Sequence, residues 1–330
     1  MPKPTNQKQK LIRLLQIFTE KTDADHALNS AELLEELAKY DIYAERKSIY
    51  TDVTALNELG YDIEKKGGHN GGYYLASRNL EKYELSLLVN AVSSSKFISL
   101  KKSRQLIKKL EGLLSVYEAK ELDREVYVNN RIKSDNESIY YVVNDLNSAL
   151  FNKRKITFKY CEWTVNKTLV ERNKGKVYFV SPLALSWEDE NYYLVAFDEE
   201  RESIRHYRVD KIKNLSIIDE PVSDNETVRK FDIGEYSGKT FSMYGGEDET
   251  VTLEFPAELA GVCIDRFGKE HTFIPSGDKS TFTVRVSVKV SPQFFGWIAG
   301  LSGKVKIKAP NNVLEEYKAF VQNLFDGLEG

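Results

Sequence analysis

The stretch RKSIYTDVTALNELGYDIEKKGGHNGGYYL, residues 46–75, decides how the first part of this chain folds. Ile49, Val53 and Leu56 recur at helical spacing, which predicts a helix with one buried face. Gly60 is the residue type that most often follows a helix, because glycine accepts the left-handed backbone conformation found there. Two short strands then flank a glycine-rich tip. The segment therefore predicts a helix followed by a β-hairpin.

Two further helices are predicted upstream of this segment. KLIRLLQIF, residues 10–18, places its leucines and its phenylalanine on one helical face. Asn29 is a predicted N-cap, and Glu32 lies three residues later, as in a capping box. Three helices that close on a hairpin predict a winged helix-turn-helix in residues 1–78, whose third helix enters the major groove of DNA.

The third helix and the hairpin supply the predicted contacts to DNA. The outward face of the helix offers hydrogen-bond donors near its N-terminal end, as recognition of bases and phosphates requires. Residues 1–75 hold ten Lys/Arg against twelve Asp/Glu, so a DNA-binding face must be sharply one-sided. Alternatively, these cations are ordinary surface residues and the glycines only complete a turn. The predicted DNA-binding residues are Arg46, Lys47, Ser48, Tyr50 and Thr51 on the helix, with Lys65, Lys66, His69 and Asn70 on the hairpin.

Residues 79–152 are predicted to form a helical connector. SRQLIKKLEGLLSVY (103–117) and IYYVVNDLNSAL (139–150) each carry an apolar stripe, with a charged stretch between them. Because these stripes need a partner, we expect dimer contacts in this region. Residues 96–133 hold ten Lys/Arg against five Asp/Glu, which indicates either a solvated helix face or a contact with DNA phosphates.

From residue 153 onward the apolar period changes to two. Five short strands within residues 153–221 predict a small, strongly bent antiparallel barrel. Residues 222–248 are rich in Gly, Ser and acidic side chains and are predicted to be a linker. Residues 249–330 follow a β-α-β-β-α-β order, a ferredoxin-like layout with one additional helix, in which Ser291 and Pro292 begin the second helix. The predicted fold class is therefore α+β with several domains.

Composition places the chain among globular proteins of a reducing compartment. Hydrophobic residues make up 41% and charged residues 29% of the 330-residue chain. No apolar run approaches the roughly 18 residues that span a bilayer, and the polar N-terminus is unlike a signal peptide. Cys161 and Cys263 lie far apart in the sequence and form no CxxC motif, so we interpret them as buried thiols of a reducing compartment. We expect a cytoplasmic protein.

Motifs for catalysis are missing from the sequence. The four histidines occur singly, without partners at metal-ligand spacing. No phosphate-binding glycine motif opens a helix after a strand, and no GxSxG motif is present. We therefore expect no enzymatic activity, no cofactor and no metal site.

Three motifs, in order along the chain, resemble the WYL-domain transcriptional regulators of bacteria. Residues 46–75 resemble their amino-terminal winged helix, NYYLVAF and IRHYRVDKI resemble the WYL domain, and FFGWIAGLSGKVKIKAP resembles their carboxy-terminal extension. The Trp-Tyr-Leu motif corresponds to Tyr192, Tyr193 and Leu194. Thr51 replaces an arginine of the family, which removes a contact to phosphate or base.

The resemblance implies an Sm-like barrel that senses a ligand, in some members single-stranded nucleic acid. The rings and cations of NYYLVAFDEERESIRHYRVDKI, residues 191–212, fit this role, because cations follow phosphates and rings stack on bases. Arg208 has an alternative role in an internal ion pair with Asp210, and Tyr193 and Leu194 are assigned to core packing. The predicted ligand-binding residues are Tyr160, Tyr192, Arg205, His206, Arg208 and Lys211.

These features together predict a ligand-responsive transcriptional regulator that binds two-fold operator DNA as a homodimer. Its expected partners are double-stranded operator DNA, a single-stranded nucleic acid or nucleotide effector, and a second copy of the chain, with no membrane. The alternative is a nucleic-acid-binding accessory subunit of a phage-defence or DNA-repair system, which would have no operator of its own.

Overall fold

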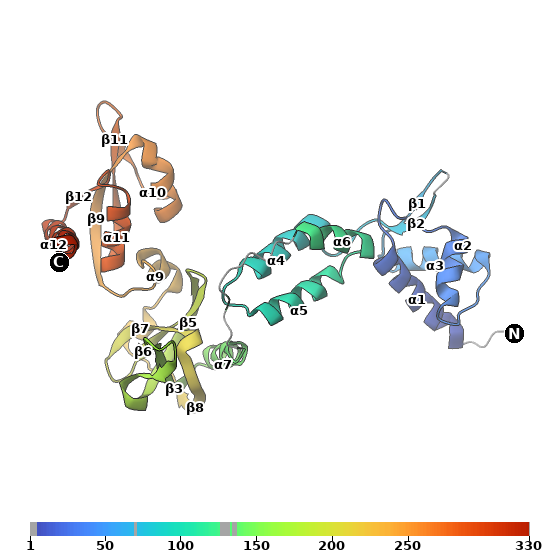
Figure 1. Cartoon of the computed structure of the whole chain (residues 1–330), viewed down its shortest axis with the longest axis horizontal. Helices are drawn as coiled ribbons and strands as arrows, with labels where there is room; N and C mark the ends of the chain where they lie inside the picture. Colours follow the sequence, from blue (N-terminus) through green and yellow to red (C-terminus); the bar gives the residue numbers. More distant parts are fainter. Residues whose placement is uncertain (1–4, 69–70, 126–132, 134–136, 330) are drawn as a thin grey trace. The chain divides into compact units, whose positions relative to one another are not determined.

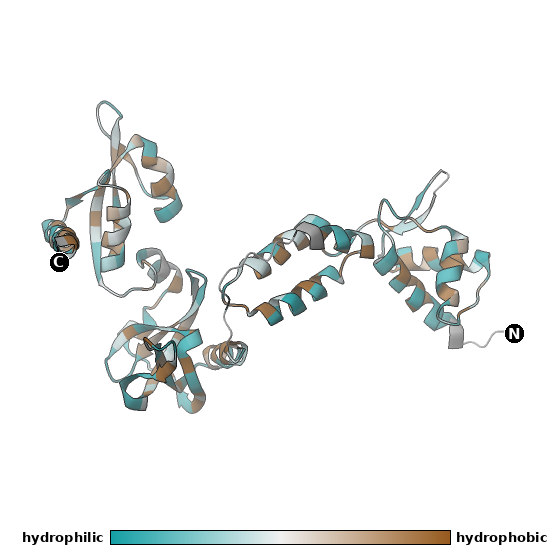
Figure 2. Ribbon diagram, viewed as in Figure 1, coloured by the Kyte–Doolittle hydropathy of each residue, from teal (hydrophilic) through white to brown (hydrophobic). Residues whose placement is uncertain are grey.

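The structure, a computed structural model, describes residues 5–68, 71–125, 133 and 137–329. The chain is a mixed α/β protein that divides into two compact units, residues 1–135 and 136–330 (Figure 1). Each unit has its own hydrophobic core, and apolar and polar side chains alternate around most of its helices (Figure 2).

The first half of unit 1 contains the predicted helices and hairpin. These are α1 (Thr5–Lys21), α2 (Ser30–Ala38), α3 (Arg46–Glu58), β1 (Ile63–Lys66) and β2 (Gly72–Leu75). The capping box of Asn29 and Glu32 at the start of α2 is confirmed. Gly60 ends α3 with φ +92°, and the Tyr61 amide donates to the Leu56 carbonyl, as in a Schellman motif.

The core of this half is formed where the apolar faces of the three helices meet. Leu14, Leu33, Ile49 and Leu56 are almost completely buried there. The hairpin is joined to the loop before α2, since the amide and carbonyl of Leu28 both bond to the backbone of Tyr73. The apolar spacing in the sequence therefore identified the faces that pack.

The second half of unit 1 contains α4 (Lys82–Ser94), α5 (Leu100–Glu111) and α6 (Val116–Glu125). The apolar stripe predicted over residues 103–117 is divided between two helices. Gly112 ends α5, and Ser115 starts a new helix by accepting from the Glu118 amide. The apolar stripe folds back on itself because Ile107 and Leu114 both join a small core with α4.

A polar joint, formed by Asp23, His26, Arg78, Ser115 and Tyr117, connects the two halves of unit 1. Ser115 Oγ donates to the buried Asp23 carboxylate at 2.5 Å, and His26 Nδ1 lies 2.7 Å from the same carboxylate. The His26 ring stacks on Tyr117 at 3.6 Å between centroids. Arg78 donates to backbone carbonyls of both halves. The joint holds the α4–α6 helices against the three-helix bundle.

Unit 2 begins with α7 (Ile139–Phe151) and a six-stranded antiparallel sheet of order β4-β3-β5-β6-β7, in which β8 also pairs with β3. The helix packs on this sheet through Ile139, Leu146 and Ala149, so the second stripe of the predicted connector finds its partner within the same unit. The strands are β3 (Arg154–Trp163), β4 (Leu169–Glu171), β5 (Val177–Glu188), β6 (Asn191–Asp198), β7 (Ser203–Arg208) and β8 (Ile212–Pro221).

The segment predicted to link the sheet to the last domain is itself folded. Residues 222–248 contain the short helices α8 (Glu226–Arg229) and α9 (Ile233–Lys239). Phe241 and Met243 follow them and are about 95% buried, with Phe241 part of the following core. The Gly- and Ser-rich composition of this segment gave no indication that Phe241 and Met243 pack in the interior.

The last part of unit 2 is a four-stranded sheet of order β10-β11-β9-β12, and every neighbouring pair is antiparallel. Ser291 caps α11 by accepting from the Phe294 amide and Pro292 begins the helix, both as predicted. The elements are β9 (Glu247–Pro256), α10 (Ala260–Phe267), β10 (Ile274–Pro275), β11 (Thr281–Val290), α11 (Pro292–Gly300), β12 (Lys306–Ala309) and α12 (Asn311–Glu329).

Candidate nucleic-acid interface and ligand pocket

The outward face of α3 presents exposed cations and hydroxyls. Arg46, Lys47 and Thr51 are exposed, while Ile49 and Val53 on the opposite face belong to the core. Neither cation forms an ion pair with any described residue. Both lie in the first turn, where no acidic side chain offsets them and where the helix macrodipole is positive. This end of α3 is therefore suited to attract an anion.

Tyr50 and Ser48 are already engaged by the protein. Arg46 Nε donates to the Tyr50 hydroxyl at 3.0 Å, and Ser30 Oγ lies 3.5 Å from the same oxygen. These bonds, first from Ser30 and then from Arg46, lower the pKa of Tyr50. Ser48 Oγ donates to the Glu45 carbonyl at 2.7 Å, so Ser48 helps to start the helix. Tyr50 consequently positions Arg46.

The two lysines of the hairpin that were predicted to bind DNA differ in their surroundings. Lys65 is exposed, with its Nζ 5.9 Å from the centroid of the Tyr73 ring. Lys66 Nζ instead donates to the Ala24 carbonyl at 2.7 Å, which ties the hairpin to the loop before α2. His69 and Asn70 lie outside the described residues.

In unit 2, Tyr160 belongs to an aromatic cluster with Phe158, Tyr178 and Tyr207. The ring centroids within this cluster lie 5.0 to 6.5 Å apart. The Tyr160 hydroxyl accepts the backbone N–H of Arg208, and burial raises the pKa of Tyr160 to about 12. The Tyr160 ring, predicted to stack on a ligand, is therefore largely used in internal packing.

Arg208 forms the internal ion pair that was the alternative to ligand binding. Its Nε and Nη2 donate to the two oxygens of Asp210 at 3.0 and 2.8 Å. The strand that carries Arg208 ends there, because residues 209–211 form a short 3₁₀ turn. Lys211 therefore does not continue the alternation of faces along β7. Tyr192 packs edge-on against Trp187, 4.6 Å between centroids.

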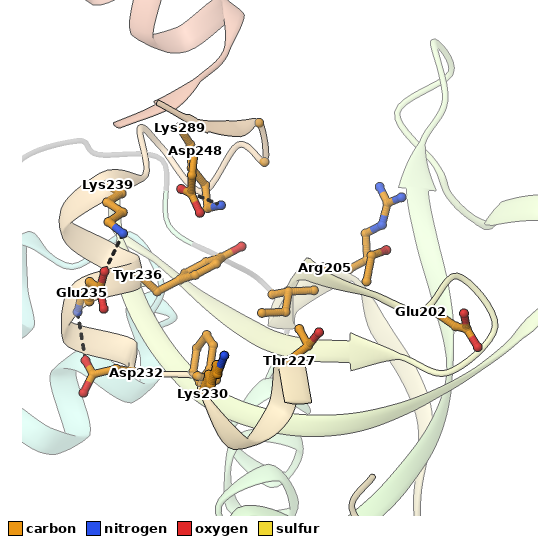
Figure 3. A pocket seen from close by; sticks show the side chains of 15 residues that line it. Glu202, Arg205, Thr227, Lys230, Asp232, Glu235, Tyr236, Lys239, Asp248 and Lys289 are labelled. Carbon is orange, nitrogen blue, oxygen red and sulfur yellow. Dashed lines mark hydrogen bonds and ion pairs between the residues drawn. The ribbon is translucent and has the colours of Figure 1, made fainter. Parts of the chain in front are cut away.

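A pocket of about 710 Å³ lies between β7, the α8–α9 segment and the ends of β9 and β11. Of the six predicted ligand-binding residues, only Arg205 lines it. Phe231 and Tyr236 form its aromatic wall, with ring centroids 5.3 Å apart. In Figure 3 the Tyr236 ring extends from α9 towards the strand that carries Arg205.

The charges of the pocket are mostly paired. Lys239 bonds Glu235 at 2.5 Å, and Lys289 bonds Asp248 at 3.1 Å. Lys289 also lies 4.9 Å above the Tyr236 ring. Arg205 is exposed and forms no ion pair with a described residue. Glu202 and Asp232 also line the pocket and form no ion pair with a described residue. One unpaired guanidinium beside two rings therefore suits a small anionic ligand that carries a ring better than a long polyanion, which these carboxylates would repel.

Sequence patterns did not reveal most of this pocket. Lys230, Tyr236 and Lys239 lie in the segment predicted to be a linker, and Lys289 comes from a strand of the last domain. The sequence signal that could have indicated the pocket was the presence of aromatic residues, Phe231 and Tyr236, within a Gly- and Ser-rich stretch.

His206 packs against the Tyr236 ring, and burial determines the protonation state of its imidazole. The two rings are 5.4 Å apart and edge-on, and the imidazole bonds the Met243 backbone. Burial lowers the pKa of His206 to about 4 from 6.5, and the Lys289 and Arg205 charges lower it further, against the Met243 bond, which raises it. The folded unit therefore holds this histidine neutral at physiological pH.

A pH dependence of stability follows from His206. The unfolded chain binds a proton at His206 below pH 6.5 and the folded unit only near pH 4, so the stability of unit 2 decreases as pH falls through this window. The contribution reaches up to about 3 kcal/mol. Urea unfolding followed by tryptophan fluorescence at pH 7 and 4.5 measures it. His206→Gln should reduce the loss of stability between pH 7 and pH 4.5, and His271→Gln should not. An equal loss in the wild-type protein and both variants would contradict the assignment of this pH dependence to His206.

Within the described ranges, no group of three His, Cys, Asp or Glu side chains is placed to hold a metal ion. Every helix there is too short or too polar to cross a bilayer. Cys161 and Cys263 are buried free thiols, and burial raises the pKa of Cys263 to about 11. Both cysteines are thus packing residues with unreactive thiols.

Residues 141–217 match the WYL domain family, so the chain contains a WYL domain that extends from α7 into β8. Among solved structures, the chain is similar to proteasome accessory factor B/C (PafBC) of Arthrobacter aurescens, with 17% identity, a TM-score of 0.29, and coverage of 96% of this chain and 48% of that one. It is also similar to a CRISPR Cas-related protein, with 14% identity, a TM-score of 0.35, and coverage of 75% and 72%. The chain thus spans about half the length of the PafBC chain. No curated protein matches.

Proposed function

We propose that this protein is a DNA-binding transcriptional regulator. The helices and hairpin of residues 5–75 form a winged helix-turn-helix in which α3 is the recognition helix. The observation that carries the proposal is the one-sidedness of α3. Its inner face is completely buried, while Arg46 and Lys47 at its N-terminal end are exposed and lack acidic partners among the described residues. The protein is proposed to have no enzymatic activity.

The second unit is proposed to sense the effector. The strand order around β3 supports an Sm-like barrel, and the order β10-β11-β9-β12 supports a ferredoxin-like extension. We place the effector in the pocket beside β7, with Arg205 as its anionic anchor and Phe231 and Tyr236 as its stacking surface. Arg208, which the sequence favoured for this role, is held by Asp210.

Fluorescence anisotropy tests the proposed function. The full chain is titrated onto duplex from its own upstream region and onto a scrambled duplex, at two salt concentrations and with or without a nucleotide or short single-stranded oligonucleotide. A regulator binds the upstream duplex selectively, and the added nucleotide or oligonucleotide changes the affinity. Binding that ignores sequence and falls steeply with salt would reflect phosphate contacts only and would favour the accessory-subunit function.

We further propose that the protein dimerises through the second half of α12. The apolar stripe of this helix is buried at Val313 and continues into exposed Val321, Leu324, Phe325 and Leu328, with Leu328 84% exposed. An antiparallel copy would place Val321 opposite Leu324 and Phe320 opposite Phe325. It would also bring Lys318 beside Asp326 of the partner subunit, so that the surface is complementary to itself.

Charged residues in this stripe should separate the dimer. Leu324→Glu combined with Leu328→Glu introduces four carboxylates into the apolar contact, and we expect a monomer in size-exclusion chromatography with light scattering. Asn323→Glu, on the neighbouring polar face, should remain dimeric. A double variant that stays dimeric would show that α12 is not the dimer interface. A monomeric wild-type chain would refute the dimer.

A further inference from the structure

A second basic surface lies on α5, in the same unit as the recognition helix. Arg104, Lys108 and Lys109 are exposed, and none of them forms an ion pair with a described residue. Their face is opposite to Ser103 and Ile107, which are buried. In Figure 2 polar and apolar stretches alternate along this helix, as expected for one buried and one solvated face.

Helix stability explains only part of this arrangement. Lys108 and Lys109 lie in the last turn, where the macrodipole favours cations. Arg104 gains nothing from the dipole and repels Lys108 one turn later, which destabilises the helix. Elsewhere in unit 1 ion pairs balance such charges, including the pair between Lys10 and Asp52 at 2.8 Å. An unbalanced face of this kind indicates an anionic partner.

The polar joint fixes where this face lies relative to α3. Arg78 bonds the Thr19 and Thr22 carbonyls at the end of α1 and the Leu113 carbonyl just beyond α5. Ser115 of the same turn bonds Asp23. A surface on α5 is thus held in a set position with respect to DNA bound by α3.

We propose that the basic face of α5 binds the phosphate backbone of duplex DNA flanking the site read by α3. This inference rests on the proposed function. The exposed face contains no aromatic side chain, so it lacks the stacking platforms that single strands require. Arg104 and Lys108 are separated by about 6 Å of helix rise, close to two base pairs along the duplex axis. The contact adds affinity and salt dependence without sequence preference.

The salt dependence of duplex binding tests this contact. In the full chain, Arg104→Gln, Lys108→Gln and Lys109→Gln are combined, and affinity for the upstream duplex is measured across a salt series. The slope of log K against log salt should decrease by up to about 2.7, since each lost phosphate contact removes about 0.9. Affinity should fall by a similar factor on a scrambled duplex. The control combines Lys213→Gln, Lys269→Gln and Lys306→Gln in unit 2, with the same change in net charge and an unchanged slope.

The outcomes separate this inference from the proposed function. An unaltered slope in the α5 variant, together with lost binding in a Lys47→Ala variant, would overturn the α5 contact and leave the regulator intact. A wild-type chain that does not bind duplex would overturn both. Circular dichroism verifies folding. A second variant, Arg104→Glu with Lys108→Glu, removes two of the three contacts and should reduce the slope by up to about 1.8.

Discussion

Replacing Arg46 and Lys47 together by alanine is expected to lower affinity for the upstream duplex by about 100-fold. Each side chain is exposed at the N-terminal end of α3, and the Tyr50 hydroxyl positions Arg46 there through its Nε. A specific contact of this kind contributes about 1–3 kcal/mol, so losing two removes most of the discrimination between upstream and scrambled duplex. Anisotropy titrations with both duplexes measure the change.

A matched control removes two other exposed cations of the same unit, Lys8 and Lys120, by alanine substitution. This control alters net charge equally and should lose affinity only slightly, without change in selectivity. Equal losses in both double variants would mean that overall charge, and not the face of α3, governs binding. The proposed recognition helix would then be wrong.

Gly72→Ala is expected to destabilise unit 1 by about 3 kcal/mol, at the upper end of what overpacking costs. A Cβ at this position would lie 2.3 Å from the Leu28 carbonyl carbon, 2.4 Å from its oxygen and 2.6 Å from the Asn29 amide nitrogen. All three are backbone atoms, and Asn29 is the N-cap of α2. Relief of the clash requires separating the hairpin from the helical bundle.

Gly67→Ala in the same hairpin provides the control, because a Cβ there meets nothing within 4 Å. All three tryptophans lie in unit 2, so tryptophan fluorescence reports on that unit alone while hydrogen exchange follows α2 and β2. Gly72→Ala should accelerate exchange in α2 and β2 and leave the tryptophan transition in place. Unchanged exchange would show that the hairpin adapts without strain.

Local patterns in the sequence were sufficient for the helices and caps of the first half of unit 1 and for the start of α11 in unit 2. The spacing of Ile49, Val53 and Leu56 identified the buried face of α3, and Asn29, Gly60 and Ser291 are the caps that the sequence indicated. These features depend on residues within one or two turns of each other. Neighbouring residues alone therefore specify them.

The break of the 103–117 stripe is an instructive exception. A stripe of correct period is compatible with one long helix or with two short ones that fold back. Gly112 and Ser115 permit the second arrangement, and burial of Ile107 and Leu114 in one core with α4 selects it. Periodicity alone cannot distinguish these, because both bury the same side chains.

The sequence by itself determined the order of the elements, the outward face of α3 and the presence of rings and cations around residues 191–212. The tertiary structure decided how those groups are used. It paired Arg208 with Asp210, enclosed the hydroxyl of Tyr160 and left Arg205 free beside rings from a segment about 30 residues away. The physical reason is that pairing and burial depend on which distant segments meet, and alternation along one strand does not specify those meetings.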